Sequence, residues 1–468
     1  MTCSQLEDRL STGTRELVRQ LLQDHMDLRA EHEERLAGVT SADGAVHSAV
    51  EAGHERPLAT VFGQVAVRRR AYRHLGQANL YPADAALNLP TELYSHNLRR
   101  HAAEEAARGS FHEAVAAVER ACGQHVPKRQ LEELVRRSAA DFDRYYASAE
   151  RQEASPGDVV VMSADGKGIV VRSEALRPAT AAAATSEEGA TRLSKGAKRY
   201  RRRMAEIGVV YVATPAARTP EDVMGSDEDL GGRERSPGPV ARAKWLTASV
   251  ADDAADVIAE VFAEADRRDP RHERAWVALV DGNRHQIDVI KKQAKKRKVK
   301  VTIVCDFVHV LQYLFGAASC FFPAGSPAAE AWVKEKALEV LRSRASVVAG
   351  SITRKATRLG LDKDQREDAD TCAKYLLAKS KYLDYATALE KGWPIATGVV
   401  EGACRHLVKD RMDITGARWG LRGAEAVLKL RALRSNGDFS SYWAYHLAQE
   451  QERVHKSRYF NGVLPRAA

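Results

Sequence analysis

The feature that most constrains the fold of this chain is a series of short apolar segments between residues 159 and 305. Their length and their content of valine and isoleucine are typical of buried β-strands. The pattern predicts strands at 159–162, 207–213, 245–250, 275–280 and 299–305. Amphipathic helices are expected on either side of the fourth strand, because apolar residues recur there at helical spacing, first over 252–268 and again from Ile287.

Three strands followed by helix, strand, helix and strand is the order of a ribonuclease-H-like core. We therefore predict an α/β fold, with a mixed five-stranded sheet and helices on its faces. Residues 311–393 have helical composition with breaks at proline and glycine, which predicts a helical insertion domain. The core is then expected to occupy 155–310 and 394–437, and a C-terminal tail to occupy 438–468.

The N-terminal region, 1–154, is predicted to be mainly helical, with helix over 1–55 and one strand-like stretch over 60–72. Within it, an apolar helical face beginning at Phe111 stops at Gly123, and a second helix begins near Lys128. Two helices joined by a glycine-containing turn, with basic residues on the second, are typical of a DNA-binding helix-turn-helix at about 110–138. An ordinary helical hairpin with solvated charges fits the same pattern.

The charge balance favours an anionic partner. The 468 residues include 72 Lys and Arg against 63 Asp and Glu, a formal net charge of +9, which suggests nucleic acid. No membrane partner is expected, because the longest apolar stretch, 308–322, is too short to cross a bilayer. The first ten residues already carry charges, and the six cysteines form no C-x-x-C pair. A cytoplasmic protein with reduced thiols is therefore predicted.

Three carboxylates are candidates for chemistry because of where they fall along the chain. Asp165 follows the first strand, Asp281 follows the fourth, and Glu401 lies early in a helix for which Thr397 is the expected N-cap. The first and fourth strands are neighbours in the predicted sheet, so these side chains can meet at one edge. Hard divalent cations prefer such oxygen ligands, and two of them can clamp an in-line phosphoryl transfer.

Each acid also has a structural explanation. Asp-Gly is a common turn dipeptide, which accounts for Asp165 and Asp281, and the helix dipole favours Glu401 in a first turn. Asp306 competes for the role of second acid, because it also follows a strand and His309 lies three residues later. That pair could bind a metal or form a structural hydrogen bond.

Basic residues gather near the predicted strands and near Glu401, where they could meet phosphates or form a solvated face. Trp419 could stack on a base or belong to the core. The candidate DNA-binding residues are Lys195, Lys198, Arg199, Arg201, Arg202, Arg203, Lys291, Lys292, Lys295, Lys296, Arg405, Lys409, Arg411 and Trp419.

Four segments of the chain resemble those of a known family of enzymes. They read VVVMSADGKGIV, WVALVDGNRHQID, VTIVCDFVHVLQYL and GWPIATGVVEGACRHLVKDRMDITGARWG. They are similar to segments of bacterial insertion-sequence transposases of the ISKra type, which are DDE transposases with a ribonuclease-H-like core. The similarity runs over about 156–437, and the upstream segment TVFGQVAVRRRAY and the C-terminal segment RALRSNGDF also resemble the family.

The resemblance implies that Asp165 is the first acid, Asp281 the second and Glu401 the last. In the related Mutator-like and hAT-like transposases the middle Asp follows the fourth strand, and an Asp/Cys-x-x-His motif, here Asp306 and His309, follows the fifth. It further implies two divalent metal ions, Mg²⁺ or alternatively Mn²⁺, as cofactors. The implied partners are double-stranded DNA, both transposon terminal inverted repeats and target DNA, and further copies of the chain on that DNA.

The implied activity is cleavage at transposon ends and transfer of the 3′-hydroxyl into target DNA, in the bacterial cytoplasm at the nucleoid. Two other functions fit the same residues. One is a catalytically silent DNA-binding protein derived from a transposase. The other is a structure-specific nuclease on the same fold.

Overall fold

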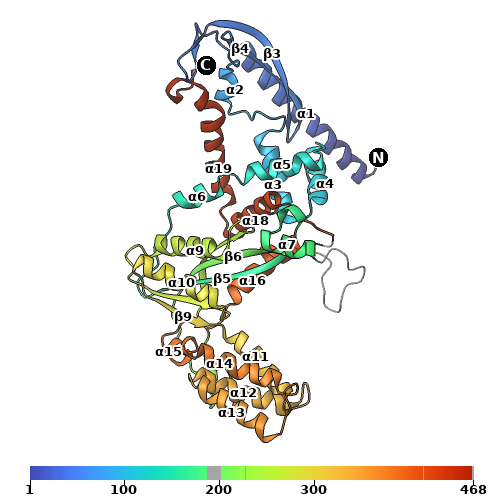
Figure 1. Ribbon diagram of the computed structural model, residues 1–468. Coiled ribbons are helices and arrows are strands. Elements are labelled where there is room, and N and C mark those ends of the chain that lie inside the picture. The colour runs from blue at the N-terminus through green and yellow to red at the C-terminus, as the bar shows by residue number, and fades with distance from the viewer. Residues whose placement is uncertain (187–201, 227, 415, 466–468) are drawn as a thin grey trace. The chain divides into compact units, whose positions relative to one another are not determined.

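The computed structural model describes residues 1–186, 202–226, 228–414 and 416–465 (Figure 1). The chain forms two compact units. One comprises Met1–Ala149 together with Gly420–Ala468, and the other comprises Glu150–Trp419. The predicted core segment 394–437 is therefore divided, because the chain leaves the second unit at Trp419.

The first unit begins with a long helix, α1 (Cys3–Glu31), followed by an antiparallel hairpin of β3 (Ala49–Thr60) and β4 (Gly63–Arg73). A short ribbon of β1 (Val39–Thr40) and β2 (Val46–His47) lies between them in sequence. The strand expected over 60–72 is confirmed as β4. The helix expected over 1–55 is wrong beyond Glu31, because β3 is largely polar and exposed and so lacks the apolar alternation that marks a half-buried strand.

The rest of the first unit is helical. Its helices are α2 (Pro82–Ala86), α3 (His96–Arg108), α4 (Phe111–Cys122), α5 (Lys128–Ser138), α6 (Phe142–Ser148), α18 (Leu421–Asn436) and α19 (Phe439–Glu450). Helix α18 packs against α3 and α5. The residues expected to form a tail begin instead with α19, whose Glu450 lies 3.0 Å from the fully buried Arg99.

Helices α4 and α5 form the predicted pair with a short turn. Ser110 and Glu113 make a reciprocal capping box at the start of α4, and Gly123, with φ of +65°, ends it in the left-handed region. Lys128 and Arg129 are exposed at the start of α5. Two helices joined by a glycine-containing turn are therefore present, and their role as a DNA-binding helix-turn-helix stays a prediction.

The second unit contains, among the described residues, a five-stranded sheet in the order β7-β6-β5-β8-β9. Its strands are β5 (Val159–Val170), β6 (Arg202–Ala213), β7 (Ala241–Ser249), β8 (Ala275–Val280) and β9 (Val301–Cys305). Strand β6 is antiparallel to β5 and β7, whereas β8 is parallel to β5 and β9. The predicted mixed α/β sheet is confirmed.

Helices cover both faces of this sheet. Helix α9 (Ala254–Arg268) packs closely over Gly208 of β6, where an added Cβ would lie 2.5 Å from Val261. The preceding residue, Ile207, points to the other face, as does its partner Asp165 on β5. That other face carries α16 (Gly398–Ala403), which continues into a π-helical turn, Cys404–Lys409.

Further helices complete the unit around the sheet. They are α7 (Pro178–Ser186), α8 (Pro220–Met224), α10 (Arg284–Arg297) and α17 (Asp410–Met412). The predicted helical insertion is also helical in the structure, and it begins earlier than expected (Figure 1). Its helices are α11 (Phe307–Ser319), α12 (Pro327–Leu341), α13 (Ala345–Arg358), α14 (Glu367–Lys379) and α15 (Tyr385–Glu390). Within the described ranges, no helix is both long and apolar enough to cross a lipid bilayer.

Candidate active site

Three aspartates lie in or directly after three neighbouring strands: Asp165 within β5, Asp281 after β8 and Asp306 after β9. Ser163 of β5 pairs with Leu279 of β8, and Val280 of β8 pairs with Cys305 of β9. Continuing this register brings Asp165 opposite Asp281, and Asp281 opposite Asp306. In this register Asp281 and Asp306 lie at the carboxyl ends of β8 and β9, and Asp165 lies on the neighbouring strand β5 at the same level.

Asp165 lies within β5 and not after it. The strand continues to Val170, and Gly166 still pairs with Glu206 of β6, so the expected turn at Asp165-Gly166 is wrong. The side chain of Asp165 is half-buried. Its Oδ1 accepts the N–H of Gly166 at 2.7 Å, and its Oδ2 lies 3.2 Å from Sγ of Cys404. A carboxylate in mid-strand needs an explanation other than turn formation.

Cys404 connects Asp165 to Glu401. Glu401 lies in α16, and Cys404 follows it by three residues, which places both on neighbouring parts of one helix face. The Cys404 thiol donates its hydrogen bond to Asp165. Burial raises the pKa of the Cys404 thiol well above its usual range, and the charges of Asp165 and Glu401 raise it further. The thiol that donates to Asp165 is therefore protonated.

Asp281 is exposed and forms the turn that follows β8. Its Oδ1 accepts the N–H of Asn283 at 2.7 Å, and Gly282 has a φ of +99°. The turn explanation thus holds for this residue, and it leaves the side chain accessible. Tyr375 of α14 donates its hydroxyl to the carbonyl oxygen of Asp281 at 3.1 Å, so the insertion helices fix the position of this turn.

Asp306, the competing second acid, is only 2% exposed. It caps α11 by accepting the N–H groups of Val308 and His309, both at 3.2 Å, and its Oδ1 also accepts the N–H of Thr397 at 3.1 Å. The His309 ring packs edge-on against Tyr313 and Tyr375. Because both carboxylate oxygens bind backbone N–H groups, Asp306 has the contacts of a structural residue, which favours Asp281 as the second acid.

Three residues of this region were not expected from the sequence: Glu206, Cys404 and Tyr375. Glu206 lies on β6, and burial raises its pKa above the ordinary value, with the charge of Asp165 adding to the shift. A signal existed for Cys404, which lies one helical turn after Glu401. Tyr375 comes from an insertion helix whose sequence gives no indication of what it packs against.

The residue types fit a divalent metal site, although the arrangement is open. Asp165, Asp281 and Glu401 offer hard oxygen ligands of the kind that Mg²⁺ or Mn²⁺ prefers. Asp281 and Glu401 are exposed, and the Thr397 hydroxyl donates to Oε1 of Glu401 at 3.3 Å. Across the part of the chain that the structure describes, no three His, Cys, Asp or Glu side chains are close enough to hold an ion.

Some of the predicted DNA-binding residues are exposed to solvent, and others bond to the protein itself. Lys195, Lys198, Arg199 and Arg201 lie outside the described residues. Arg203 donates to the backbone carbonyls of Ala175, Val250 and Ala251, whereas Arg202 is exposed. The exposed lysines of α10 recur at positions that form one stripe along the helix: Lys291, Lys292, Lys295 and Lys296. Arg405 and Lys409, which follow Glu401, are also exposed.

Two predicted DNA contacts are wrong. Arg411 is 2% exposed and Trp419 is 6% exposed. The Trp419 ring N–H donates to the carbonyl of Met412 at 3.0 Å, and the Arg411 guanidinium lies 4.8 Å from the ring centre. Because the tryptophan is packed inside the second unit, it has no free face for a base, and the core interpretation holds.

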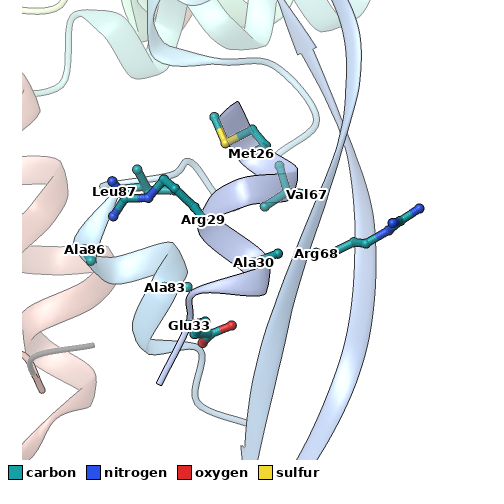
Figure 2. Close-up of a pocket in the computed structure, with 9 residues that line it drawn as sticks. All are labelled: Met26, Arg29, Ala30, Glu33, Val67, Arg68, Ala83, Ala86 and Leu87. Atoms are coloured by element: carbon teal, nitrogen blue, oxygen red, sulfur yellow. The ribbon is translucent and has the colours of Figure 1, made fainter. Parts of the chain in front are cut away.

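A small cavity lies in the first unit, whereas the candidate acids belong to the second unit. It has a volume of about 20 Å³ and is lined by residues of α1, β4 and α2 together with Glu33, as Figure 2 shows. None of the candidate acids is among its lining residues.

Comparison with models of known protein families gives no match, and comparison with curated proteins gives none either. Function is therefore inferred from the side chains themselves. They offer two exposed carboxylates and one half-buried carboxylate near one sheet edge, with the lysine stripe of α10 beginning ten residues after Asp281.

Proposed function

We propose that this chain is a DNA transposase with a ribonuclease-H-like catalytic core. It cuts phosphodiester bonds at transposon ends and joins the released 3′-hydroxyl to target DNA. The observation that carries the proposal is the placement of Asp165 in β5, Asp281 after β8 and Glu401 on the helix beside Asp165. The sheet order and the helical insertion between β9 and α16 support it, as do the segments that resemble ISKra-type transposases.

The three acids would hold two divalent ions, which supply a Lewis acid for the attacking and leaving oxygens of the phosphodiester. Other residues of the chain hold these acids in position. Cys404 keeps Asp165 in one orientation by donating a hydrogen bond to Oδ2. The hydroxyl of Tyr375 fixes the turn that carries Asp281. No covalent protein–DNA intermediate is required, so no serine or tyrosine nucleophile is assigned.

DNA would follow the exposed basic side chains next to the acids. Asn283, in the turn that contains Asp281, caps the start of α10, and this helix carries the lysine stripe. Arg405 and Lys409 extend from the helical segment of Glu401. Phosphate contacts from such residues orient the backbone of a duplex without reading its sequence. Sequence reading would then fall to the first unit, through α5 of the helix-turn-helix.

The test uses the full-length chain and Mg²⁺ with DNA fragments taken from the two sides of its own gene and a supercoiled target plasmid. Joined products are expected, and they should disappear with EDTA or with Asp165→Asn. Nicks without joining would indicate the structure-specific nuclease, and a mobility shift without any cut would indicate the catalytically silent DNA-binding protein. Either of these last two results would overturn the transposase proposal.

A further inference from the structure

Strand β5 carries two charged side chains on one face where it passes the helix of Glu401. Asp165 and Lys167 are two residues apart in a continuous strand, so both point to the face that α16 and its π-helical turn cover. Gly166 and Gly168, at the alternate positions, belong to the opposite face. The sequence Asp-Gly-Lys-Gly therefore places both of its charges on the Glu401 side of the sheet.

Packing on the opposite face fixes this arrangement. An added Cβ at Gly166 would lie 2.8 Å from Cε of Met204 and 3.1 Å from a carboxylate oxygen of Glu206, both on β6. Side chains of β6 therefore occupy that face of β5 and leave no room for a further one. Because a shift of one residue would exchange the two faces, the strand register holds Lys167 on the same side as Asp165.

Lys167 has a half-buried side chain that none of the nearby carboxylates engages. Within the described parts of the chain, its ammonium forms no hydrogen bond and no ion pair. Its charge nevertheless reaches the candidate site. The pKa of the Cys404 thiol is raised chiefly by burial, and the charge of Lys167 acts on it in the opposite direction. An ammonium without a protein partner therefore lies near the thiol that binds Asp165.

The pairing of the strands leaves this stretch of β5 open on one side. The parallel pairing of β5 with β8 ends at Ser163 and Leu279. Beyond that point β5 has β6 on one side and, among the described residues, no paired strand on the other. Asp281 follows directly after β8 and so lies at the open side. A phosphodiester that reaches Asp165 and Asp281 from there also meets the stretch that carries Lys167.

The chemistry of the proposed reaction gives such an ammonium a ligand. In-line displacement at a phosphodiester concentrates negative charge on the non-bridging oxygens of the attacked phosphate. A lysine ammonium is a compact charge with three donors, which suits these oxygens. We propose that Lys167 is a further catalytic residue, whose ammonium binds a non-bridging oxygen of the scissile phosphodiester. This inference rests on the proposed transposase function, because it assigns Lys167 to the same reaction as the three acids.

The first experiment measures single-turnover cleavage by the full-length chain with Mg²⁺, on DNA from one side of its own gene. Lys167→Met keeps most of the length of the side chain and removes its charge. Cleavage should be about 100-fold slower, the typical cost of removing one group that stabilises transition-state charge. The melting temperature and the Kd for DNA should change little. Lys167→Arg keeps a cation and should recover part of the rate. Lys244→Met, at an exposed lysine of the strand β7, is the matched control and should cleave as the wild type does.

The second experiment needs neither a variant nor cleavage. The lysines of the wild type are acetylated with an N-hydroxysuccinimide ester, free and bound to the same DNA, and the modified positions are read by mass spectrometry. Ca²⁺ replaces Mg²⁺, because its looser coordination disfavours cleavage. Bound DNA should protect Lys167 from acetylation and leave Lys244 as reactive as in the free protein.

The outcomes separate this inference from the function on which it rests. A wild type that cleaves while Lys167→Met cleaves at the same rate would overturn the inference alone, and so would a DNA complex in which Lys167 reacts as fast as in the free protein. A slow variant with a lower melting temperature that Lys167→Arg does not rescue would indicate a structural role and would also overturn it. A wild type that binds DNA without cutting it would overturn the proposed function, and the catalytic role of Lys167 with it.

Discussion

The carboxylate of Asp306 accepts the backbone N–H of Thr397 at 3.1 Å, linking positions 91 residues apart. Asp306 also caps α11, so one side chain fixes both the start of the insertion and the approach to α16. In addition, the N–H of Phe307 donates to the carbonyl of Ile395 at 2.9 Å. The helix that carries Glu401 is therefore held to the end of β9 by Asp306 and its neighbour. Asp281 makes no comparable tertiary bond with its carboxylate among the contacts of the described residues.

This difference separates the two candidate second acids. Asp281→Asn should retain the turn, because an amide oxygen can still accept the Asn283 N–H, and the melting temperature should not change. Cleavage should fall about 1,000-fold, which corresponds to ~4 kcal/mol of lost transition-state stabilisation. Asp288→Asn, an exposed acid on α10, serves as the control and should cleave normally.

Asp306→Ala should instead lower the stability of the protein and leave the cleavage step of the folded protein intact. It leaves the N–H groups of Val308, His309 and Thr397 without their acceptor in a buried region, at a cost of about 3 kcal/mol in the free energy of unfolding. Urea denaturation measures this loss, and a cleavage assay on the folded fraction measures activity. Full strand transfer by Asp281→Asn, together with an inactive but fully stable Asp306→Ala, would reverse the assignment.

Tyr375→Phe tests whether the insertion positions Asp281. The change removes the hydroxyl that donates to the Asp281 carbonyl and keeps the ring, which stacks on Tyr313 at 4.2 Å between centroids. We expect a loss of about 1 kcal/mol in stability, a several-fold slower cleavage step and an unchanged Kd for DNA. Tyr382→Phe is the matched control, because its hydroxyl contacts Lys291 instead. Equal effects of both variants on cleavage would contradict a positioning role.

The salt dependence of DNA binding tests whether the lysine stripe of α10 contacts phosphates. Removing two phosphate contacts with Lys295→Ala/Lys296→Ala should reduce the slope of log Kd against log salt concentration by about two, since each contact contributes roughly 0.9. Lys363→Ala/Lys374→Ala removes the same charge from exposed positions of the insertion, and it should leave the slope unchanged. Identical slopes for the two double variants would indicate that only net charge matters.

The sequence predicts the strands best where burial alone defines them. The range 275–280 is the observed β8, because every residue of it after Ala275 is buried. Strands β5 and β6 extend well beyond their apolar segments, since the polar stretch from Asp165 to Gly168 is held by pairing with β6 and not by burial. Apolar periodicity cannot detect a strand that is held by its neighbour's hydrogen bonds.

The candidate site and the division into two units show a second limit: sequence patterns do not reveal long-range contacts. Asp281 and Asp306 could be placed because the ends of β8 and β9 are visible in the sequence, whereas the position of Asp165 within β5 could not be predicted. The position of Cys404 one helical turn after Glu401 is visible in the sequence, but its hydrogen bond to Asp165 is not. The role of Tyr375 could not be predicted either, because it depends on a contact with Asp281, which is 94 positions away. Likewise, the sequence placed 421–437 in the predicted core, and nothing in its pattern specifies that α18 packs against α3 and α5 of the first unit.

Glu33, which lies beside the cavity of Figure 2, is a buried acid with one unused oxygen. It is 5% exposed, and its Oε2 accepts the N–H of Arg70 at 2.8 Å. Its Oε1 has no hydrogen-bond partner among the described residues, and a cavity of about 20 Å³ has room for one water molecule. Burial is the main cause that raises the pKa of Glu33 above its ordinary value of 4.5.

A raised pKa in the folded state means that folding takes up a proton between the unfolded and the folded pKa. The contribution of Glu33 to stability is therefore fully present below about pH 4.5 and is lost as the pH rises through the folded pKa. Glu33→Gln keeps an oxygen for the Arg70 N–H and removes the buried charge. At pH 7.5 it should raise the free energy of unfolding by about 1 kcal/mol, and at pH 4 it should have little effect. Urea denaturation at both pH values measures this, with the exposed Glu31→Gln as control, and a variant that is less stable than wild type at pH 7.5 would contradict the prediction.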